Sequence, residues 1–210
     1  MQYSEAYFDY QKEIGAFGGR ANLFKFAPFI QPTDSVLDFG CGGGYLLHHI
    51  DAASKAGIEI NPVARETAQQ SGLTIYASST EVPDGAFDVI VSNHALEHVE
   101  SPLDELRALL PKLRPGGRIV FVVPHQKPGE PYRPNDPNQH LYTWNPLTLG
   151  NLFQAAGYAN VRADVIRHMW PPDFAQVYER YGQQIFDVIC RLRAYRKRNY
   201  QIRAYGERPR

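Results

Sequence analysis

The feature that most constrains the fold is a cluster of glycines directly after a short apolar run. Residues 36–39 read VLDF, and the next five residues are Gly40, Cys41, Gly42, Gly43 and Gly44. Glycine has no Cβ, so the chain can turn there with a positive φ and a ligand can lie directly against the backbone. Residues 46–53 are predicted to form a helix whose first amides would point at that ligand. The segment therefore predicts a strand, a tight turn and a helix, an arrangement shared by many nucleotide sites.

Apolar runs of strand length alternate with helical stretches after this turn. Strands are predicted at residues 35–39, 57–60, 74–76, 87–92 and 118–123, and helices at residues 46–53, 61–72 and 104–113. Strands separated by helices imply right-handed crossovers and a doubly wound, mostly parallel α/β sheet with helices on both faces. Such sheets bind ligands at the carboxyl ends of their strands. Because 43% of the 210 residues are hydrophobic, we expect residues 1–210 to form a single domain.

Residues 1–30 are rich in aromatic side chains and precede the first predicted strand. Tyr3, Tyr7 and Tyr10 share one face of a short predicted helix, and glycines at positions 15, 18 and 19 interrupt the run of aromatic residues. A second helix is predicted to end near Pro28. These rings either cap the core or form a helical lid over a bound ligand, with Arg20 near the ligand's anion.

Two later segments also bear on function. Residues 124–146 contain six prolines, which exclude a helix or a central strand, and a long loop after a strand is usually functional. We expect this segment, called here the substrate loop, to contact a small substrate. A helix at 146–157 and a strand at 159–168 follow it.

A long amphipathic helix is predicted at residues 173–198, before a last strand. Its apolar stripe either packs on the sheet or forms a homodimer interface. Residues 191–203 are strongly basic and are either a solvated helix face or a site for phosphates. The apolar positions at helical spacing are Phe174, Val177, Tyr178, Tyr181, Ile185, Val188, Ile189 and Leu192.

The composition limits the partners and the compartment. Lys and Arg number 22, as do Asp and Glu, so the chain has no global field that would attract nucleic acid or a membrane. Only Cys41 and Cys190 are present, which suits a reducing cytosol, and no run of about 18 apolar residues predicts a membrane span. We therefore expect a cytoplasmic protein whose partner is a small molecule.

An acidic residue at the end of the second predicted strand indicates a ribose. Glu59 follows Gly40 by 19 positions, and a carboxylate there can accept both ribose hydroxyls. Nicotinamide and flavin dinucleotide sites also combine a glycine turn with an acid at the end of the second strand, so these two features alone do not identify the cofactor. Tyr45 stands where the dinucleotide fingerprint requires its third glycine, and Asp38 would repel a pyrophosphate but attract an ammonium group. The ligand implied has a ribose and an amine but no diphosphate.

These residues resemble the first motif of class I S-adenosylmethionine-dependent methyltransferases, and the resemblance spans residues 34–157. GIEINPVARETA is similar to the ribose-binding segment of that family, GAFDVIVSNHALEHV to its fourth strand and LRPGGRIVFVVP to its fifth. The small-molecule methyltransferases are the most similar branch. The resemblance implies a seven-stranded sheet and S-adenosyl-L-methionine as cofactor. It implies contacts from Asp38 and residues 40–44 to the methionine end, from Glu59 to the ribose, from Ile60 to adenine, and from Ser92 and Asn93 to the methionine amine.

The chain departs from the family pattern after the third strand. Family members often have an aspartate there that contacts the adenine amino group, whereas this chain has Ala77, Ser78 and Ser79, so Ser78 is the substitute that we expect. At the end of the fourth strand, SNHA replaces the proline-containing string of methyltransferases that modify nucleic-acid bases. Base methylation, and nucleic acid as a partner, are therefore disfavoured.

Three histidines are candidates for a general base. Methyl transfer from a sulfonium is an in-line displacement, so an enzyme aligns the acceptor and removes a proton from an oxygen nucleophile. A neutral histidine suits this task. His140 in the substrate loop is the first candidate, followed by His94 at the end of the fourth strand and by His125.

The sequence therefore predicts an S-adenosylmethionine-dependent methyltransferase acting on a hydroxyl of a small polar metabolite, for example a sugar or nucleotide sugar. The alternatives are an NAD(P)-dependent oxidoreductase and a non-catalytic module that binds the cofactor.

His94, Glu97 and His98 form the pattern H-x-x-E-H, which on a helix would place three metal ligands on one face. A related E-x-x-E-H pattern in some quinone-biosynthesis O-methyltransferases is associated with metal. Imidazoles are more often satisfied by hydrogen bonds than by a metal ion, so no metal is predicted.

Overall fold

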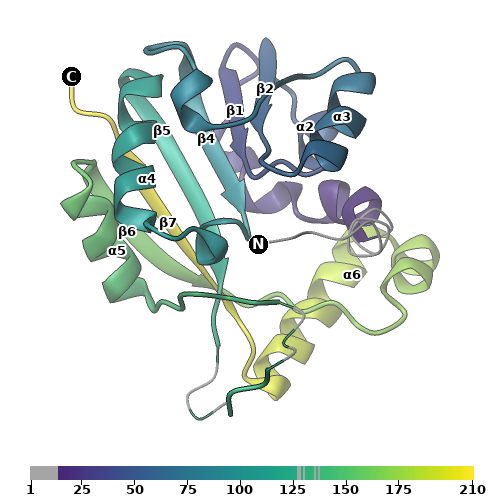
Figure 1. Ribbon diagram of the computed structural model, residues 1–210. Helices are drawn as coiled ribbons and strands as arrows, with labels where there is room; N and C mark the ends of the chain where they lie inside the picture. Colours follow the sequence, from purple (N-terminus) through teal and green to yellow (C-terminus); the bar gives the residue numbers. More distant parts are fainter. Residues whose placement is uncertain (1–13, 127–128, 130, 135, 137) are drawn as a thin grey trace.

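Seven strands form one sheet in the computed structural model, which describes residues 14–126, 129, 131–134, 136 and 138–210 (Figure 1). The strand order is β3-β2-β1-β4-β5-β7-β6, with β1 to β5 parallel and β7 antiparallel to both β5 and β6. The predicted α/β fold class is confirmed. The strands are β1 (Ser35–Phe39), β2 (Ser54–Ile58), β3 (Thr74–Tyr76), β4 (Phe87–Asn93), β5 (Leu113–Pro124), β6 (Ala159–Ile166) and β7 (Gln201–Glu207).

Five labelled α-helices and several short 3-10 turns connect the strands. The predicted helix at 46–53 is shorter in the structure, because Ile50 adopts an extended backbone with ψ 127°. The helices are α2 (Tyr45–His49), α3 (Pro62–Gln70), α4 (Pro102–Leu109), α5 (Pro146–Ala155) and α6 (Phe174–Lys197). Residues 14–21 are also helical, and 3-10 turns include η1 (Leu23–Lys25) and η4 (Leu96–His98).

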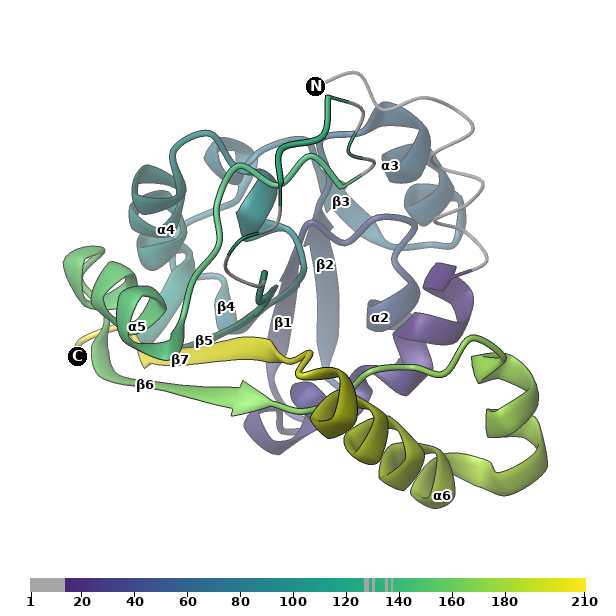
Figure 2. The same ribbon diagram turned by 90° about the horizontal axis from the view of Figure 1, so that it is seen from below.

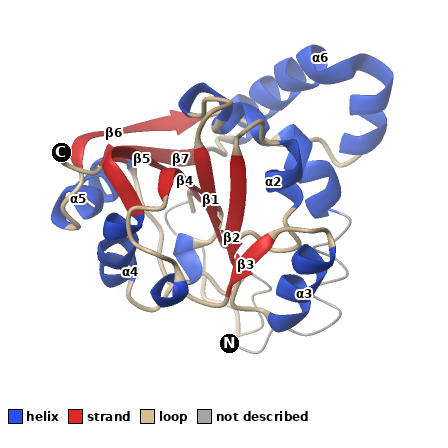
Figure 3. Cartoon of the chain, turned by 90° about the horizontal axis from the view of Figure 1, so that it is seen from above, coloured by secondary structure: helices blue, strands red, loops and turns tan. Residues whose placement is uncertain are grey.

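Helices cover both faces of the sheet (Figures 2 and 3). Side chains alternate along each strand, so a central strand that is apolar throughout buries one set on each face. In β5, Phe121 packs with residues of α4 and α5, whereas its neighbour Val122 packs with residues of α2 and α3. This double burial explains why the β1, β4 and β5 segments are apolar runs rather than alternating patterns.

The helix at residues 14–21 lies directly on the start of α2. A Cβ on Gly19 would come within 2.6 Å of the Tyr45 carbonyl carbon, and one on Gly15 within 2.5 Å of the Tyr45 ring. Both glycines therefore permit a close helix contact. A helix over residues 14–21 was not predicted from the sequence. Tyr3, Tyr7 and Tyr10 of the predicted lid lie outside the described residues.

Helix α6 projects away from the sheet between β6 and β7 (Figures 1 and 2). Gly182 interrupts it with a left-handed φ of 71°, so the two halves do not share a helical register. Phe174, Val177 and Tyr178 pack with Phe17, while Tyr181, Ile185, Val188 and Leu192 are exposed. The predicted apolar residues of this helix therefore do not form one stripe. None of the described helices is long and apolar enough to cross a membrane.

Candidate functional site

A cavity of about 1100 Å³ lies at the carboxyl ends of β1, β2, β4 and β5. Residues of the 14–21 helix, the substrate loop and the segments that flank α6 complete its wall. The cavity brings together most of the site residues predicted from the sequence, namely Asp38, Gly40, Cys41, Gly42, Glu59, Ile60, Ser78, Asn93, His94 and His140.

The Glu59 carboxylate is fixed beside the glycine turn by two backbone amides. Its Oε2 accepts a hydrogen bond from Gly42 and its Oε1 accepts one from Asn61, each at 2.8 Å. Burial raises the pKa of Glu59, while these hydrogen bonds act in the opposite direction. Each carboxylate oxygen has a second lone pair, so the group can also accept hydroxyls of a ligand. This geometry fits the ribose role expected for Glu59.

Asp38 provides a second carboxyl group on the same cavity wall. It is 3% exposed, and burial together with the nearby Glu59 charge raises its pKa well above the usual range. The same surroundings raise the pKa of the Cys41 thiol, which therefore stays neutral and acts as a small packing group. Two carboxyl groups without a cation between them favour a ligand that brings an ammonium group and hydroxyls. S-Adenosylmethionine carries both, so the residues present fit this cofactor.

The adenine end is the most open part of the cavity. Ile60 is 65% exposed although it is a large apolar residue, and it lines the cavity beside Asn61. Such an exposed apolar side chain suits a flat aromatic ring. The Ser78 hydroxyl also lines this end and shares a 2.7 Å hydrogen bond with Thr80.

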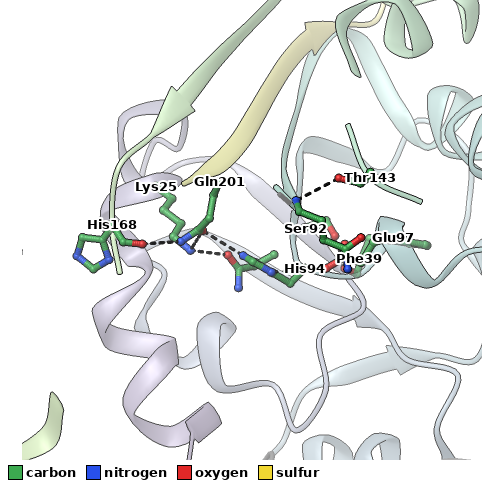
Figure 4. Close-up of polar contacts among 10 residues, drawn as sticks. Lys25, Phe39, Ser92, His94, Glu97, Thr143, His168 and Gln201 are labelled. Atoms are coloured by element: carbon green, nitrogen blue, oxygen red, sulfur yellow. Dashed lines mark hydrogen bonds and ion pairs between the residues drawn. The ribbon is translucent and has the colours of Figure 1, made fainter. Parts of the chain in front are cut away.

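Three residues expected at the cofactor are placed elsewhere. Arg20 is exposed, with its guanidinium 5.2 Å from the centre of the Tyr178 ring, and does not line the cavity. Gly44 caps the start of α2 with a φ of 79°, outside the cavity wall. The Ser92 hydroxyl donates to the Phe39 carbonyl at 2.8 Å, which ties β4 to β1 in the core (Figure 4).

A buried lysine that the sequence analysis missed lies at the acceptor end of the cavity. Lys25 is 1% exposed, and its Nζ donates to Asn93 Oδ1 at 2.9 Å and to Gln201 Oε1 at 2.6 Å (Figure 4). Burial lowers its pKa to about 7, although Glu97 acts in the opposite direction. A single lysine inside the apolar run LFKFAPF was the available signal, because burying an amine requires specific partners.

Gln201 determines which ring nitrogen of His94 carries the proton. The Gln201 amide nitrogen donates to the His168 carbonyl at 3.1 Å, so its Oε1 faces Lys25 and His94. His94 Nε2 lies 3.0 Å from that oxygen and must therefore donate, which leaves Nδ1 with a free lone pair. Burial and the nearby Lys25 lower the pKa of His94 to about 3. His94 is thus a neutral imidazole that can accept a proton through Nδ1.

His94, Glu97 and His98 do not share a helical face. His94 ends β4 with a left-handed φ of 60°, and only residues Leu96–His98 form a 3-10 turn. His140 from the substrate loop takes the third place instead, because ligand atoms of Glu97, His98 and His140 all lie within 4.8 Å of one another. These three residues are called here the loop cluster.

Polar atoms of the loop cluster are buried and unsatisfied. Both carboxyl oxygens of Glu97 and the Nδ1 atoms of His98 and His140 find no hydrogen-bond partner among the described residues. Burial raises the pKa of Glu97 to about 8 and lowers the pKa values of both histidines. Glu97 Oε1 also lies 3.5 Å from His94 Nδ1. A carboxyl group and two neutral imidazoles at these separations could hold a divalent cation.

The substrate loop is attached to this cluster through its backbone. Leu141 donates to the Glu97 carbonyl at 2.9 Å, and the Tyr142 hydroxyl donates to the Glu100 carbonyl at 2.8 Å. His125, the third candidate base, stacks on Tyr200 with ring centres 4.0 Å apart. The loop thereby brings His140 to the acceptor end of the cavity, while His125 forms part of the wall.

Comparison with known sequences identifies the family. The methyltransferase domain profile matches residues 13–163, which is most of the chain. A ubiquinone biosynthesis O-methyltransferase of Roseobacter denitrificans is 37% identical over 122 residues, covering 53% of this chain and 49% of the relative. A ribosomal protein L11 methyltransferase of Burkholderia vietnamiensis is 37% identical over 101 residues, covering 44% of this chain and 32% of the relative. The chain thus spans half or less of the length of these curated relatives.

Solved structures share the fold at low sequence identity. A SAM-dependent methyltransferase from Archaeoglobus fulgidus superposes with a TM-score of 0.69 at 18% identity, covering 96% of this chain and 99% of that one. Phosphoethanolamine N-methyltransferase 2 of Haemonchus contortus, in complex with S-adenosyl-L-methionine, gives a TM-score of 0.71 at 14% identity, covering 100% of this chain and 58% of that one. The fold is therefore that of the S-adenosylmethionine-dependent methyltransferases.

The chain belongs to the methyltransferase domain family, because the profile of that family matches well over half of its length. The predicted family and the predicted cofactor, S-adenosyl-L-methionine, are confirmed. The family match also decides against the nicotinamide alternative, as Tyr45 and Asp38 had indicated.

Proposed function

We propose that this chain transfers a methyl group from S-adenosylmethionine to a hydroxyl of a small polar acceptor, with His94 as the general base. The orientation of His94 carries this proposal. Gln201 accepts a hydrogen bond from His94 Nε2, so the lone pair of His94 Nδ1 is free. His94 lines the cavity next to Asn93. A hydroxyl nucleophile needs such a proton acceptor, because its own pKa lies far above neutral pH.

The protein residues around the acceptor provide position and a route for its proton. When bound, S-adenosylmethionine supplies an electrophilic methyl group on a sulfonium. The acceptor hydroxyl gives its proton to His94 Nδ1, and the imidazolium that forms lies 3.5 Å from the Glu97 carboxyl group. A Glu97 carboxylate stabilises that imidazolium, whereas a protonated Glu97 does not. Lys25 holds Gln201 in place and adds positive charge near a developing oxyanion.

The loop cluster gives His140 a different role from the one first expected. Its Nδ1 is buried and, like His98 Nδ1 and both carboxyl oxygens of Glu97, has no hydrogen-bond partner among the described residues, and ligand atoms of the three residues lie within 4.8 Å of one another. We propose that Glu97, His98 and His140 bind a divalent cation, in place of the expectation that no metal is present. The cluster would then orient an acceptor that offers neighbouring oxygens, while His94 takes the proton.

One of the two relatives named above supports an oxygen acceptor. The Roseobacter relative is named an O-methyltransferase, while the Burkholderia relative is named for a ribosomal protein. The substrate loop places polar groups around the acceptor end, which suits a small molecule with several hydroxyls. Sugars, nucleotide sugars and dihydroxylated aromatic rings therefore make up the acceptor set to be tested.

A methyl-transfer assay tests the proposal. The purified protein is incubated with S-adenosylmethionine carrying a labelled methyl group and with sugars, catechols or amines, and the methylated atom is located by mass spectrometry. We expect a methylated hydroxyl and a loss of rate on the order of 10²- to 10⁴-fold in His94→Ala. His48→Ala, which changes an exposed histidine on α2, is the matched control. Methylation of amines alone, or a His94→Ala variant with the wild-type rate, contradicts the proposal. Cofactor binding without transfer to any acceptor would favour the non-catalytic alternative.

A further inference from the structure

Helix α6 carries a second apolar face opposite its packed side. Phe186, Cys190 and Ala194 are at most 1% exposed and pack toward Ala21 and Trp170. The opposite positions in the half of the helix after Gly182, called here the outer stripe, are between 50% and 76% exposed and follow one another at intervals of three, four and three residues. Such spacing places side chains in one row along a helix. The outer stripe consists of Ile185, Val188, Leu192 and Tyr195.

The outer stripe is flanked by cations. Arg191, Arg196, Lys197 and Arg198 are exposed, whereas the acid in this half of the helix, Asp187, is already bound by His168 at 3.1 Å. A groove of about 510 Å³ continues from the stripe along β6, and its wall includes Leu192 and Tyr195 together with Arg167, Arg191 and Arg203. Apolar side chains and arginines therefore occur on the same exposed surface.

We propose that the outer stripe and its arginines dock on an anionic lipid surface. A helix that lies in a membrane interface buries an apolar face between the headgroups while its Lys and Arg side chains contact lipid phosphates. Tyr195 lies at the end of the stripe, and tyrosine is favoured at the boundary between apolar and wet regions. The outer half of α6 meets each of these requirements, and it does so without spanning the bilayer.

A second copy of the chain fits this surface less well. Two α6 helices paired in parallel through their outer stripes by a two-fold axis would bring Arg191 and Arg196 of one copy next to the same residues of the other. Like charges in such flanking positions oppose pairing. A nucleic acid would neutralise the arginines but would leave the aliphatic row in water. The lipid surface satisfies both the charge and the apolar row.

The position of α6 links docking to the cavity. Residues 168–170 precede the helix and residues 199–201 follow it, and all six line the cavity. A docked α6 thus places the cavity wall next to the lipid surface. An acceptor that partitions into the interface would reach the site from there, but docking itself does not depend on the proposed methyl-transfer chemistry.

Vesicle sedimentation tests the docking surface. The full chain is sedimented with vesicles of phosphatidylcholine alone or of phosphatidylcholine with phosphatidylglycerol, over a range of salt concentrations. We expect binding to the anionic vesicles that falls as salt rises. Val188→Glu combined with Leu192→Glu, and separately Arg191→Glu combined with Arg196→Glu, should each lower the partition coefficient on the order of tenfold or more. Leu147→Glu, which changes an exposed leucine on α5, should leave it unchanged.

Three results overturn the proposal. The first is no binding to anionic vesicles at low salt, and the second is binding by the α6 variants at the wild-type level. The third is a stable dimer in sedimentation equilibrium that Val188→Glu converts to a monomer, which would assign the face to a second copy. Retained binding of S-adenosylhomocysteine by each variant shows that the fold is intact.

Discussion

Replacing Glu59 by glutamine tests the cofactor site at the residue whose two carboxylate oxygens are both held by backbone amides. Both carboxylate oxygens already accept a backbone amide, from Gly42 and Asn61, at 2.8 Å. Glutamine has the same size but carries one oxygen and one NH2 group, so a donor must face one of these amides in either orientation. The NH2 group cannot accept a ribose hydroxyl, and the neutral carbonyl accepts the other hydroxyl less strongly than a carboxylate does. Each of these losses costs about 1–2 kcal/mol of binding free energy. We therefore expect Glu59→Gln to weaken binding of S-adenosylhomocysteine by about 2–4 kcal/mol, roughly 30- to 1000-fold.

Isothermal titration calorimetry with S-adenosylhomocysteine measures this loss directly. Glu66→Gln, which changes an exposed glutamate on α3, is the matched control and should bind within about threefold of the wild type. His140→Ala should also stay within about threefold, because His140 lies at the acceptor end. A loss below about fivefold in Glu59→Gln, or equal losses in Glu59→Gln and His140→Ala, would refute the roles assigned to these residues.

Three further predictions concern the acceptor end and the helix contact. In protein freed of divalent cations, the residual rate of transfer should rise as pH increases through about 8, because the Glu97 carboxyl group, which a bound cation would keep deprotonated, loses its proton there; Glu97→Gln should flatten this profile, and a wild-type profile in that variant would rule out the carboxylate role. Removing divalent cations with a chelator should slow transfer, and added Mn²⁺ should restore it. Electron paramagnetic resonance should show Mn²⁺ bound to the wild type but not to His98→Ala. A wild type that binds no Mn²⁺, Mg²⁺ or Zn²⁺ refutes the cation site. Gly19→Ala should lower the free energy of unfolding in denaturant titrations by about 1–3 kcal/mol, since its Cβ would meet the Tyr45 backbone. Ala16→Ser, at an exposed position of the same helix, should change that free energy by less than about 0.5 kcal/mol. Equal stabilities of the two variants would show that the helix contact is loose.

The parts predicted from the sequence are those coded by neighbouring residues. The glycine turn and the alternation of strands and helices are local patterns, so the sheet of β1 to β5 followed from them. Glu59 could be placed because parallel strands end at one edge of the sheet. The site around Asp38 and Glu59 is a direct result of that rule, and the structure places both carboxyl groups in the same cavity.

The parts that escaped prediction depend on contacts between distant segments. Lys25 gave no periodic signal, and its role depends on Gln201, which lies 176 positions away. His140 joined Glu97 and His98 only because Leu141 bonds to the Glu97 carbonyl, a loop contact that no local pattern predicts. The helix at residues 14–21 was not predicted because helix propensity disfavours glycine, whereas the close approach to α2 requires it.

Helix α6 is a second case in which a local pattern did not predict the structure. Its apolar residues matched one helical repeat, but Gly182 adopts a left-handed φ and shifts the register between the two halves. A glycine inside a helical pattern is compatible with either a continuous or an interrupted helix. The packing of Phe186 and Cys190 against the N-terminal helix decides between them, and that packing is visible only in three dimensions.

The strand β7 ties the orientation of His94 to a distant part of the chain. It lies between β5 and β6, and Gln201 at its first position accepts hydrogen bonds from His94 Nε2 and from Lys25. Asp38 and Glu59, in contrast, belong to β1 and to the turn after β2. The cofactor end and the acceptor end of one cavity therefore depend on different strands of the sheet.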